Sequence, residues 1–361
     1  MNWRRGVGFA AIHFVLAVCL FACVAWSQAA DMDHHAFQIG AINYFGYEGL
    51  SLENVRSVLP LHIGDTLTYA TFSRKPINDA VLSAVGKGPT DVNVVCCDDS
   101  HRLLVFIGLP GSTSRPFPTS AAPSSAANLD DMGLHLYEQE MSLLEEAVAR
   151  GSAGEDDSRG YAISNDPSLK AVNLAMRAYA VERESELRKV LETAKDPTQR
   201  RAAAALLGYV RRSQTQADAL AKAMSDPDEE VRNNAVRALS VLSGAPGGGQ
   251  MQINVQPLIN LLYSGLWTDR NKASFLLQGM TNSRNPQVLD LLRRDAMGPL
   301  IEGASWTGDT GHNTPFLIIL GRIGNIRDDK LNEMLKENNS KDIISAALSS
   351  TDTDVLGLKR R

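Results

Sequence analysis

The sequence predicts a mainly α-helical protein, with an α-solenoid of about five helical hairpins in its C-terminal half and a small α+β domain before it. Three observations lead to this prediction. An apolar stripe of helical spacing recurs through residues 165–338. Asp-Pro pairs recur at thirty-residue spacing at the start of that region. Residues 37–110 instead mix strand and helix patterns.

The first thirty residues follow the pattern of a targeting segment. Arg4 and Arg5 precede an apolar run from residue 7 to residue 26, and small residues follow at Ala29 and Ala30. This order of positive, apolar and small residues is typical of a secretory signal peptide. We therefore expect residues 1–30 to be a signal peptide, cleaved after Ala29 or Ala30.

Two other fates of this segment stay open. The apolar run approaches the length that spans a bilayer, so an uncleaved N-terminal anchor is one alternative. Leu20-Phe21-Ala22-Cys23 resembles a lipobox, which would make Cys23 the acylation site of a lipoprotein. All three fates place the folded part outside the cytoplasm, in a bacterial periplasm or secreted, with a membrane tether in the last two.

Residues 37–110 predict a small domain with the element order β-α-α-β-β. A weak strand ends near residue 44, helices follow Ser51 and cover residues 74–85, and a polar turn joins two strands at residues 92–96 and 103–107. With Gly46 after the first strand and Gly64 in the loop between the helices, this order looks like a POTRA domain. The resemblance implies a domain that binds partner polypeptides, often along an exposed strand edge.

Cys96 and Cys97 are the cysteines that remain if the signal peptide is removed. Neighbouring side chains on a strand point to opposite faces. Three alternatives follow: a disulfide between the two neighbours, pairing between chains, or burial as small apolar residues.

The segments around the helical region read as connections. Residues 111–130 are rich in Pro, Ser and Ala, and residues 151–160 are rich in Gly and charged residues, so we expect residues 111–164 to be a linker that contains one helix over 132–149. Residues 339–361 read as a polar tail.

Between residues 165 and 338, apolar residues recur at positions i, i+3, i+4 and i+7, which is the core stripe of a surface helix. The stripes fall into two alternating series, and members of each series start about 30 to 43 residues apart, as expected for stacked helical hairpins. The first series covers residues 172–179, 203–210, 235–242, 273–280 and 316–323. The second covers residues 187–194, 217–224, 255–262, 288–292 and 331–335.

The starts of the helices support the repeat. Asp-Pro pairs at 166–167, 196–197 and 226–227 suit the N-cap and first helical positions, because Asp accepts free N–H groups and Pro lacks one. Asp-Pro followed by Arg and Ala-rich packing positions, as in residues 226–235, resembles the HEAT repeat family and its short bacterial form. The resemblance implies a structural ladder between repeats, and we assign Asp226 and Arg232 to it.

The composition excludes several functions. A net charge of −5 and a pI near 5.8 give no general attraction to nucleic acid. Asp31, Asp33, His34 and His35 could bind metal but lie at the start of the mature chain, so a solvated leader and no metal site are expected. No nucleophile, phosphate loop or zinc motif predicts a cofactor or a catalytic site.

One insertion between the fourth and fifth hairpins, residues 306–312, is the best candidate for recognition. It places Trp306, Asp309 and His312 on a single loop, and loops on a rigid scaffold often carry binding residues. With Trp267, these residues form the predicted binding surface. The sequence thus favours an exported, non-catalytic scaffold of the cell envelope that binds a protein or peptide partner, and the alternative is an enzyme with its site on the 306–312 loop or in an inter-domain cleft.

Overall fold

The computed structural model describes residues 36–68, 72–247, 251–308 and 310–358. The predicted signal peptide over residues 1–30, with Cys23, lies outside the described residues, as does Asp309. None of the helices in the described part is long and apolar enough to cross a membrane.

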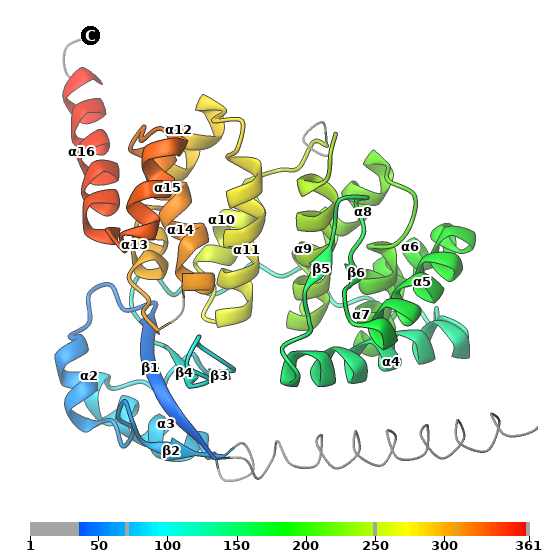
Figure 1. Ribbon diagram of the computed structural model, residues 1–361, viewed down its shortest axis with the longest axis horizontal. Coiled ribbons are helices and arrows are strands. Elements are labelled where there is room, and N and C mark those ends of the chain that lie inside the picture. The colour runs from blue at the N-terminus through cyan, green and yellow to red at the C-terminus, as the bar shows by residue number, and fades with distance from the viewer. Residues whose placement is uncertain (1–35, 69–71, 248–250, 309, 359–361) are drawn as a thin grey trace, which may run out of the picture.

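The helical region contains the two predicted series of helices in the predicted order, which confirms the solenoid (Figure 1). The first series consists of α5 (Pro167–Glu182), α7 (Pro197–Leu207), α9 (Glu229–Gly244), α11 (Trp267–Met280) and α14 (Thr310–Ile323). The second consists of α6 (Glu184–Thr193), α8 (Gln214–Ala223), α10 (Gln256–Leu262), α12 (Pro286–Asp295) and α15 (Asp328–Lys336).

The first-series helices form the more closely packed of the two layers. Helix α7 packs on α9, α9 on α11 and α11 on α14, whereas among the described second-series helices even the closest neighbours, α6 and α8, contact each other less. Closer neighbours lie on the inside of a curved stack, so we call the exposed side of the first-series helices the inner face.

Helix starts follow the predicted chemistry in two of three cases. Asp166 and Asp196 cap α5 and α7, each with Pro at the first helical position. The third prediction was wrong, because Asp228, not Asp226, accepts the first free N–H groups of α9. Asp226 lies before the helix and its carboxylate is used by an arginine of the preceding repeat.

Two helices lie outside the predicted hairpins. Helix α13 (Met297–Ala304) is inserted between α12 and α14. The predicted polar tail over 339–361 is instead largely a helix, α16 (Ser340–Leu358), whose Ile343 and Ala347 are buried against the core of the solenoid. These two apolar side chains, four residues apart on one helix face, give the segment a surface to bury.

The N-terminal domain has the predicted order of elements with one short strand added. It contains β1 (Phe37–Phe45), α2 (Leu52–Val58), β2 (Thr66–Leu67), α3 (Arg74–Val85), β3 (Asp91–Val95) and β4 (Leu103–Gly108). The strands form one sheet in the order β2-β1-β4-β3, with β1 parallel to β4 and the other pairs antiparallel.

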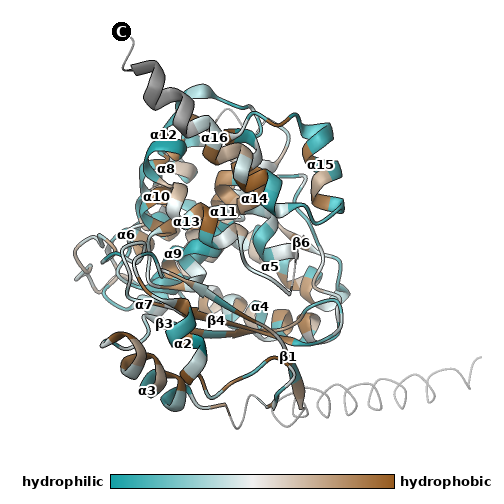
Figure 2. Ribbon diagram, turned by 90° about the vertical axis from the view of Figure 1, so that its left-hand side faces the viewer, coloured by the Kyte–Doolittle hydropathy of each residue, from teal (hydrophilic) through white to brown (hydrophobic). Residues whose placement is uncertain are grey.

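Both faces of this sheet are covered, and its strands are accordingly hydrophobic (Figure 2). On β4, Leu103, Val105 and Ile107 join a core with α2 and α3, whereas Leu104 and Phe106 join the core of the solenoid. The alternation of a strand therefore places its two sets of side chains in two different cores.

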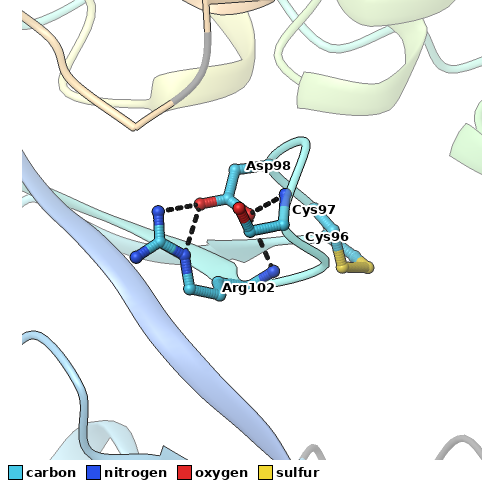
Figure 3. Close-up of a disulfide and its surroundings, with 5 residues drawn as sticks. Cys96, Cys97, Asp98 and Arg102 are labelled. Atoms are coloured by element: carbon cyan, nitrogen blue, oxygen red, sulfur yellow. Dashed lines mark hydrogen bonds and ion pairs between the residues drawn. A yellow bond between two sulfur atoms is a disulfide. The ribbon is translucent and has the colours of Figure 1, made fainter.

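Cys96 and Cys97, directly after β3, form a disulfide with each other, which is the first of the three alternatives (Figure 3). The turn that follows is held by Asp98, whose carboxylate accepts from Arg102 Nε at 2.8 Å and from the Ser100 and Arg102 amides at 2.9 Å.

The predicted linker over 111–164 is not a free connection. After helix α4 (Asp131–Ala149), the strands β5 (Glu155–Asp156) and β6 (Ile163–Ser164) pair as a hairpin against the solenoid. Residues 113–129, which we call the strap, run along the ends of the repeats. Backbone hydrogen bonds join Arg115 to Tyr263, Ser120 to Ser225 and Ser125 to Thr193, each between 2.7 and 2.9 Å.

Candidate functional site

The two tryptophans of the predicted binding surface lie between the sheet and the solenoid, not on the outside. Trp306 is 3% exposed and Trp267 is 8% exposed, and the ring of Phe106 from β4 lies 5.0 and 4.9 Å from theirs. Trp306 Nε1 donates to the Tyr44 carbonyl at 3.0 Å, and the Trp267 amide donates to Asp91 at 3.0 Å. Both tryptophans therefore hold the N-terminal domain on the solenoid.

His312 belongs to the same aromatic cluster. Its ring packs edge-on against Trp267 at 5.2 Å and Phe106 at 5.8 Å, and its Nδ1 lies 3.2 Å from Asn271 Oδ1. The predicted 306–312 loop is shorter than expected, because α14 already begins at Thr310.

A groove of about 710 Å³ lies beside this loop, between α14, the end of α15 and the start of α16. Among the described residues that line it, the charged side chains are Asp99 and Lys336, and the others are mainly Asn, Thr and Ser. The described lining of this groove is therefore made mainly of amides and hydroxyls.

Glu302 of α13 is the polar centre of the junction between the domains. Its carboxylate accepts from the Gly46 amide at 2.7 Å, the Tyr47 amide at 3.0 Å and Arg270 Nη1 at 2.9 Å, and from the Thr113 hydroxyl. A buried carboxylate needs several donors of this kind, so the turn after β1 is fixed onto the solenoid.

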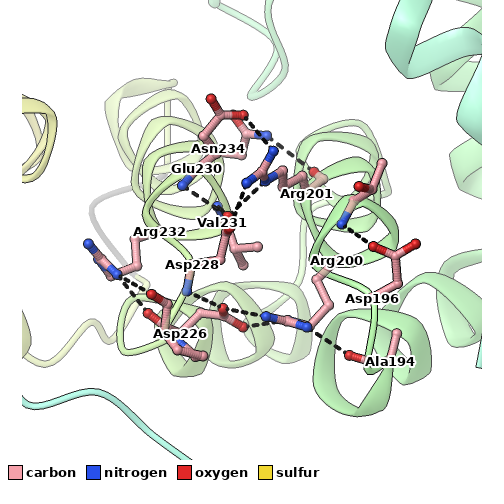
Figure 4. Close-up of polar contacts among 12 residues, drawn as sticks. Ala194, Asp196, Arg200, Arg201, Asp226, Asp228, Glu230, Val231, Arg232 and Asn234 are labelled. Atoms are coloured by element: carbon pink, nitrogen blue, oxygen red, sulfur yellow. Dashed lines mark hydrogen bonds and ion pairs between the residues drawn. The ribbon is translucent and has the colours of Figure 1, made fainter. Parts of the chain in front are cut away.

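Glu302 also ends a ladder of buried ion pairs that links consecutive repeats. Figure 4 shows its first rung, Arg200 with Asp226. Arg200 pairs with Asp226 at 2.8 Å, Arg232 with Asp269 at 2.9 Å and Arg270 with Glu302 at 2.9 Å, and each arginine also donates to backbone carbonyls. Asp226 and Arg232, assigned to the ladder from the sequence, lie in neighbouring rungs of it.

The strap lies across this ladder. Arg270 donates to the Thr113 carbonyl, the guanidinium of Arg232 lies 4.9 Å from the ring of Phe117, and Gln199 accepts from the Leu129 amide at 2.7 Å. The ladder edge of the solenoid is thus occupied by an extended segment of the same chain.

The inner face remains partly open. Helix α4 and the β5–β6 hairpin cover α5 and α7, and the sheet covers the start of α11 and α14. Between them, α11 carries the exposed Phe275 and the half-buried Lys272, and α9 carries the half-buried Arg237 and Val241. Phe275 is 41% exposed, which is unusual for an aromatic residue beside a large core.

Sequence reasoning missed these residues because it followed the buried stripe. In α11 the stripe runs through Ala273, Leu276, Leu277 and Met280, and Phe275 falls on the opposite side of the helix. A bulky aromatic residue off the core stripe was the available signal.

The comparison with family models agrees with the repeat architecture. Residues 184–274 match a family model described as HEAT repeats. The match covers the second helix of the first hairpin, the next two hairpins and the first half of α11. No curated protein matches the chain.

Solved structures similar to the chain include designed repeat proteins. A designed armadillo repeat protein, YIII(Dq)4CqI, has a TM-score of 0.33 and 17% identity, covering 52% of this chain and 95% of that one. A computationally designed armadillo repeat protein for modular peptide recognition has a TM-score of 0.34 and 17% identity, covering 61% of this chain and 97% of that one. The family match lies in the helical part, so the resemblance of residues 37–110 to a POTRA domain stays a prediction.

Proposed function

We propose that this HEAT-like repeat protein is an exported, non-catalytic scaffold that binds an extended polypeptide segment of a partner across the open part of its inner face. The observation that carries the proposal is the exposed ring of Phe275 on α11. Aromatic and arginine side chains are the residues that most often anchor a protein interface, and Arg237 lies on the neighbouring helix.

The spacing of the helices suits an extended chain. Packed helices lie about 9 Å apart, and an extended polypeptide advances about 3.3 Å per residue, so roughly three residues of a partner pass each helix. Because side chains of an extended chain alternate between its two faces, Phe275 on α11 and Val241 on α9 would contact side chains two or four positions apart. Lys272 and Arg237 favour acidic residues among the neighbours of those side chains.

The outer edge of β3 is the second contact surface of the proposal. Because β3 is the last strand in the order β2-β1-β4-β3, one of its edges has no neighbouring strand among the described residues. A partner strand could add to this edge through main-chain hydrogen bonds.

Export is proposed from the sequence of residues 1–30, with cleavage, acylation of Cys23 and an uncleaved anchor as the three alternatives. Intact-mass measurement of the native protein separates them. Loss of residues 1–29 or 1–30 indicates cleavage, a lipid on Cys23 indicates a lipoprotein, and a full-length mass indicates an anchor.

The binding proposal is tested by selecting random displayed decapeptides on the purified protein and measuring their affinity for two variants. Phe275→Ala should weaken the selected peptides at least tenfold, because truncation of an aromatic anchor costs about 2 kcal/mol or more. Leu174→Ala is the matched control, since Leu174 is 47% exposed on α5, away from the open region. Enriched peptides that bind both variants and the wild type equally would refute the proposed site.

A further inference from the structure

A small cavity opens from the inner face between α4, α7, α9 and α11. Its volume is about 130 Å³. Its polar lining comes from side chains far apart in the sequence: Tyr137, Glu140, Tyr209, Asn234, Arg237 and Lys272. An engineered apolar cavity of about 150 Å³ holds benzene, so this one has room for a group of a few heavy atoms.

Lys272 is the unusual member of this lining. Its side chain is partly buried, and among the described residues its ammonium has no hydrogen-bond or ion-pair partner. Burial, together with the nearby guanidinium of Arg237, lowers the pKa of Lys272 to about 8. The charge of Glu155 opposes this shift, but Glu155 forms its ion pair with Arg237, so the ammonium of Lys272 has no direct ion-pair partner among the described residues.

The acidic groups nearby are already used. Glu155 forms an ion pair with Arg237. Glu140 accepts from the Tyr209 hydroxyl at 3.0 Å and from Asn173 Nδ2 at 3.3 Å. Burial raises the pKa of Glu140, which favours the neutral form of its carboxyl group.

The cavity is accessible from the open part of the inner face. The side chain of Arg237 is 30% exposed at its mouth, and Val241 lines the same side. Lys272 precedes Phe275 by three residues, so the two side chains lie next to each other on one face of α11.

We propose that this cavity binds a carboxylate group, with Lys272 as its counter-ion and Arg237 as a neighbouring donor. The carboxylate could come from a free small acid or from an acidic side chain of the polypeptide partner. Only the second source rests on the proposed function.

The test follows the side-chain ¹⁵Nζ signals of lysine-labelled protein by NMR as the pH is varied, with and without acetate or succinate. The signal that is missing in Lys272→Met identifies Lys272. A carboxylate that binds the charged form should raise the pKa of Lys272 by about one unit at ten times its Kd, because bound ligand stabilises the protonated state. Acetamide and succinamide, which lack the charge, should leave it unchanged.

Lys170→Met is the matched control variant, because Lys170 is exposed on α5 outside the cavity. It should leave the response of Lys272 to acetate unchanged. Circular dichroism checks that Lys272→Met stays folded, and Lys272→Arg, which keeps the positive charge, should retain carboxylate-induced stabilisation in thermal unfolding.

The two sources are separated with a capped decapeptide, Ac-Gly-Ser-Val-Glu-Gly-Phe-Ser-Gly-Ser-Gly-NH2, and its Gln counterpart. A polypeptide source predicts that the Glu peptide raises the pKa of Lys272 more than acetate does. In Phe275→Ala, the peptide and acetate should then raise this pKa by the same amount. If acetate or succinate acts and the peptide does not, the cavity binds a free acid and this inference holds, while the proposed function is judged by the peptide selection described above. No response of Lys272 to acetate, succinate or the Glu peptide would overturn the inference.

Discussion

The ladder gives the sharpest prediction, because the chain contains two arginine–aspartate pairs of similar geometry and different burial. Arg232 contacts both oxygens of Asp269 at 2.9 Å, and Arg201 contacts both oxygens of Asp228 at 2.8 and 2.6 Å. The buried pair is 4% and 1% exposed, whereas the second pair is 31% and 15% exposed. Burial is therefore the main difference between them.

Arg232→Met should lower the free energy of unfolding by about 3 to 5 kcal/mol, because it leaves the Asp269 carboxylate buried without its cation. It also removes the donor to the Asp226 carbonyl at 2.8 Å. Arg201→Met should cost about 0 to 1 kcal/mol, since water can solvate Asp228 in its place. A double variant, Arg232→Met with Asp269→Leu, should recover much of the loss, because no buried charge is left over.

Urea unfolding followed by circular dichroism measures these free energies. Native-state hydrogen exchange shows which helices lose stability in the variant, because the stability of each repeat depends on its interfaces with the neighbouring repeats. Exchange should accelerate first where α9 packs on α11. If Arg232→Met costs no more than Arg201→Met, the ladder does not join the repeats as described.

Three further predictions concern other parts of the molecule. Lys272→Met should raise the free energy of unfolding by up to about 3 kcal/mol at pH 7, because burial depresses the pKa of Lys272 in the folded state and so penalises its charged form. In urea unfolding at several pH values, the stability difference between variant and wild type should fade as the pH rises from about 8 toward 10.5, since Lys272 then loses its charge. Glu302→Gln should accelerate hydrogen exchange of the Gly46 and Tyr47 amides, since an NH2 group replaces one of the two oxygens that accept from them. Unchanged exchange at these amides would contradict the role of Glu302 in fixing the turn after β1 onto the solenoid. Ile343→Ala should cost about 2 to 4 kcal/mol in urea unfolding if α16 is part of the core, whereas a cost near zero would indicate a separate tail.

The sequence predicted the elements whose evidence is local. Each first-series helix carries a stripe such as Ala235, Ala238, Leu239 and Leu242, and burial of that stripe is what stacks the helices. Asp196 could be assigned as a cap for the same reason, because its partners are the next few amides of the chain.

Features that depend on distant partners were not predictable in this way. The strap has the composition of a linker, yet the carbonyls of Tyr263, Ser225 and Thr193 accept its amides. Trp306 was expected on an open loop, but it packs against Phe106, two hundred residues earlier in the sequence. No local pattern at residue 306 indicates that a sheet covers it.

The strap and the sheet precede the solenoid in the sequence, but several of the residues that they pack against lie near the C-terminal end of the solenoid. Glu302 meets the amide of Gly46 across 256 positions, and Trp306 meets Tyr44 across 262. During synthesis, the face of β4 that carries Leu104 and Phe106 therefore emerges long before its cover exists. Until α11 and α13 have been made, this apolar face must stay in solution or be shielded by a chaperone, which makes the half-made chain the form of this protein most prone to aggregation.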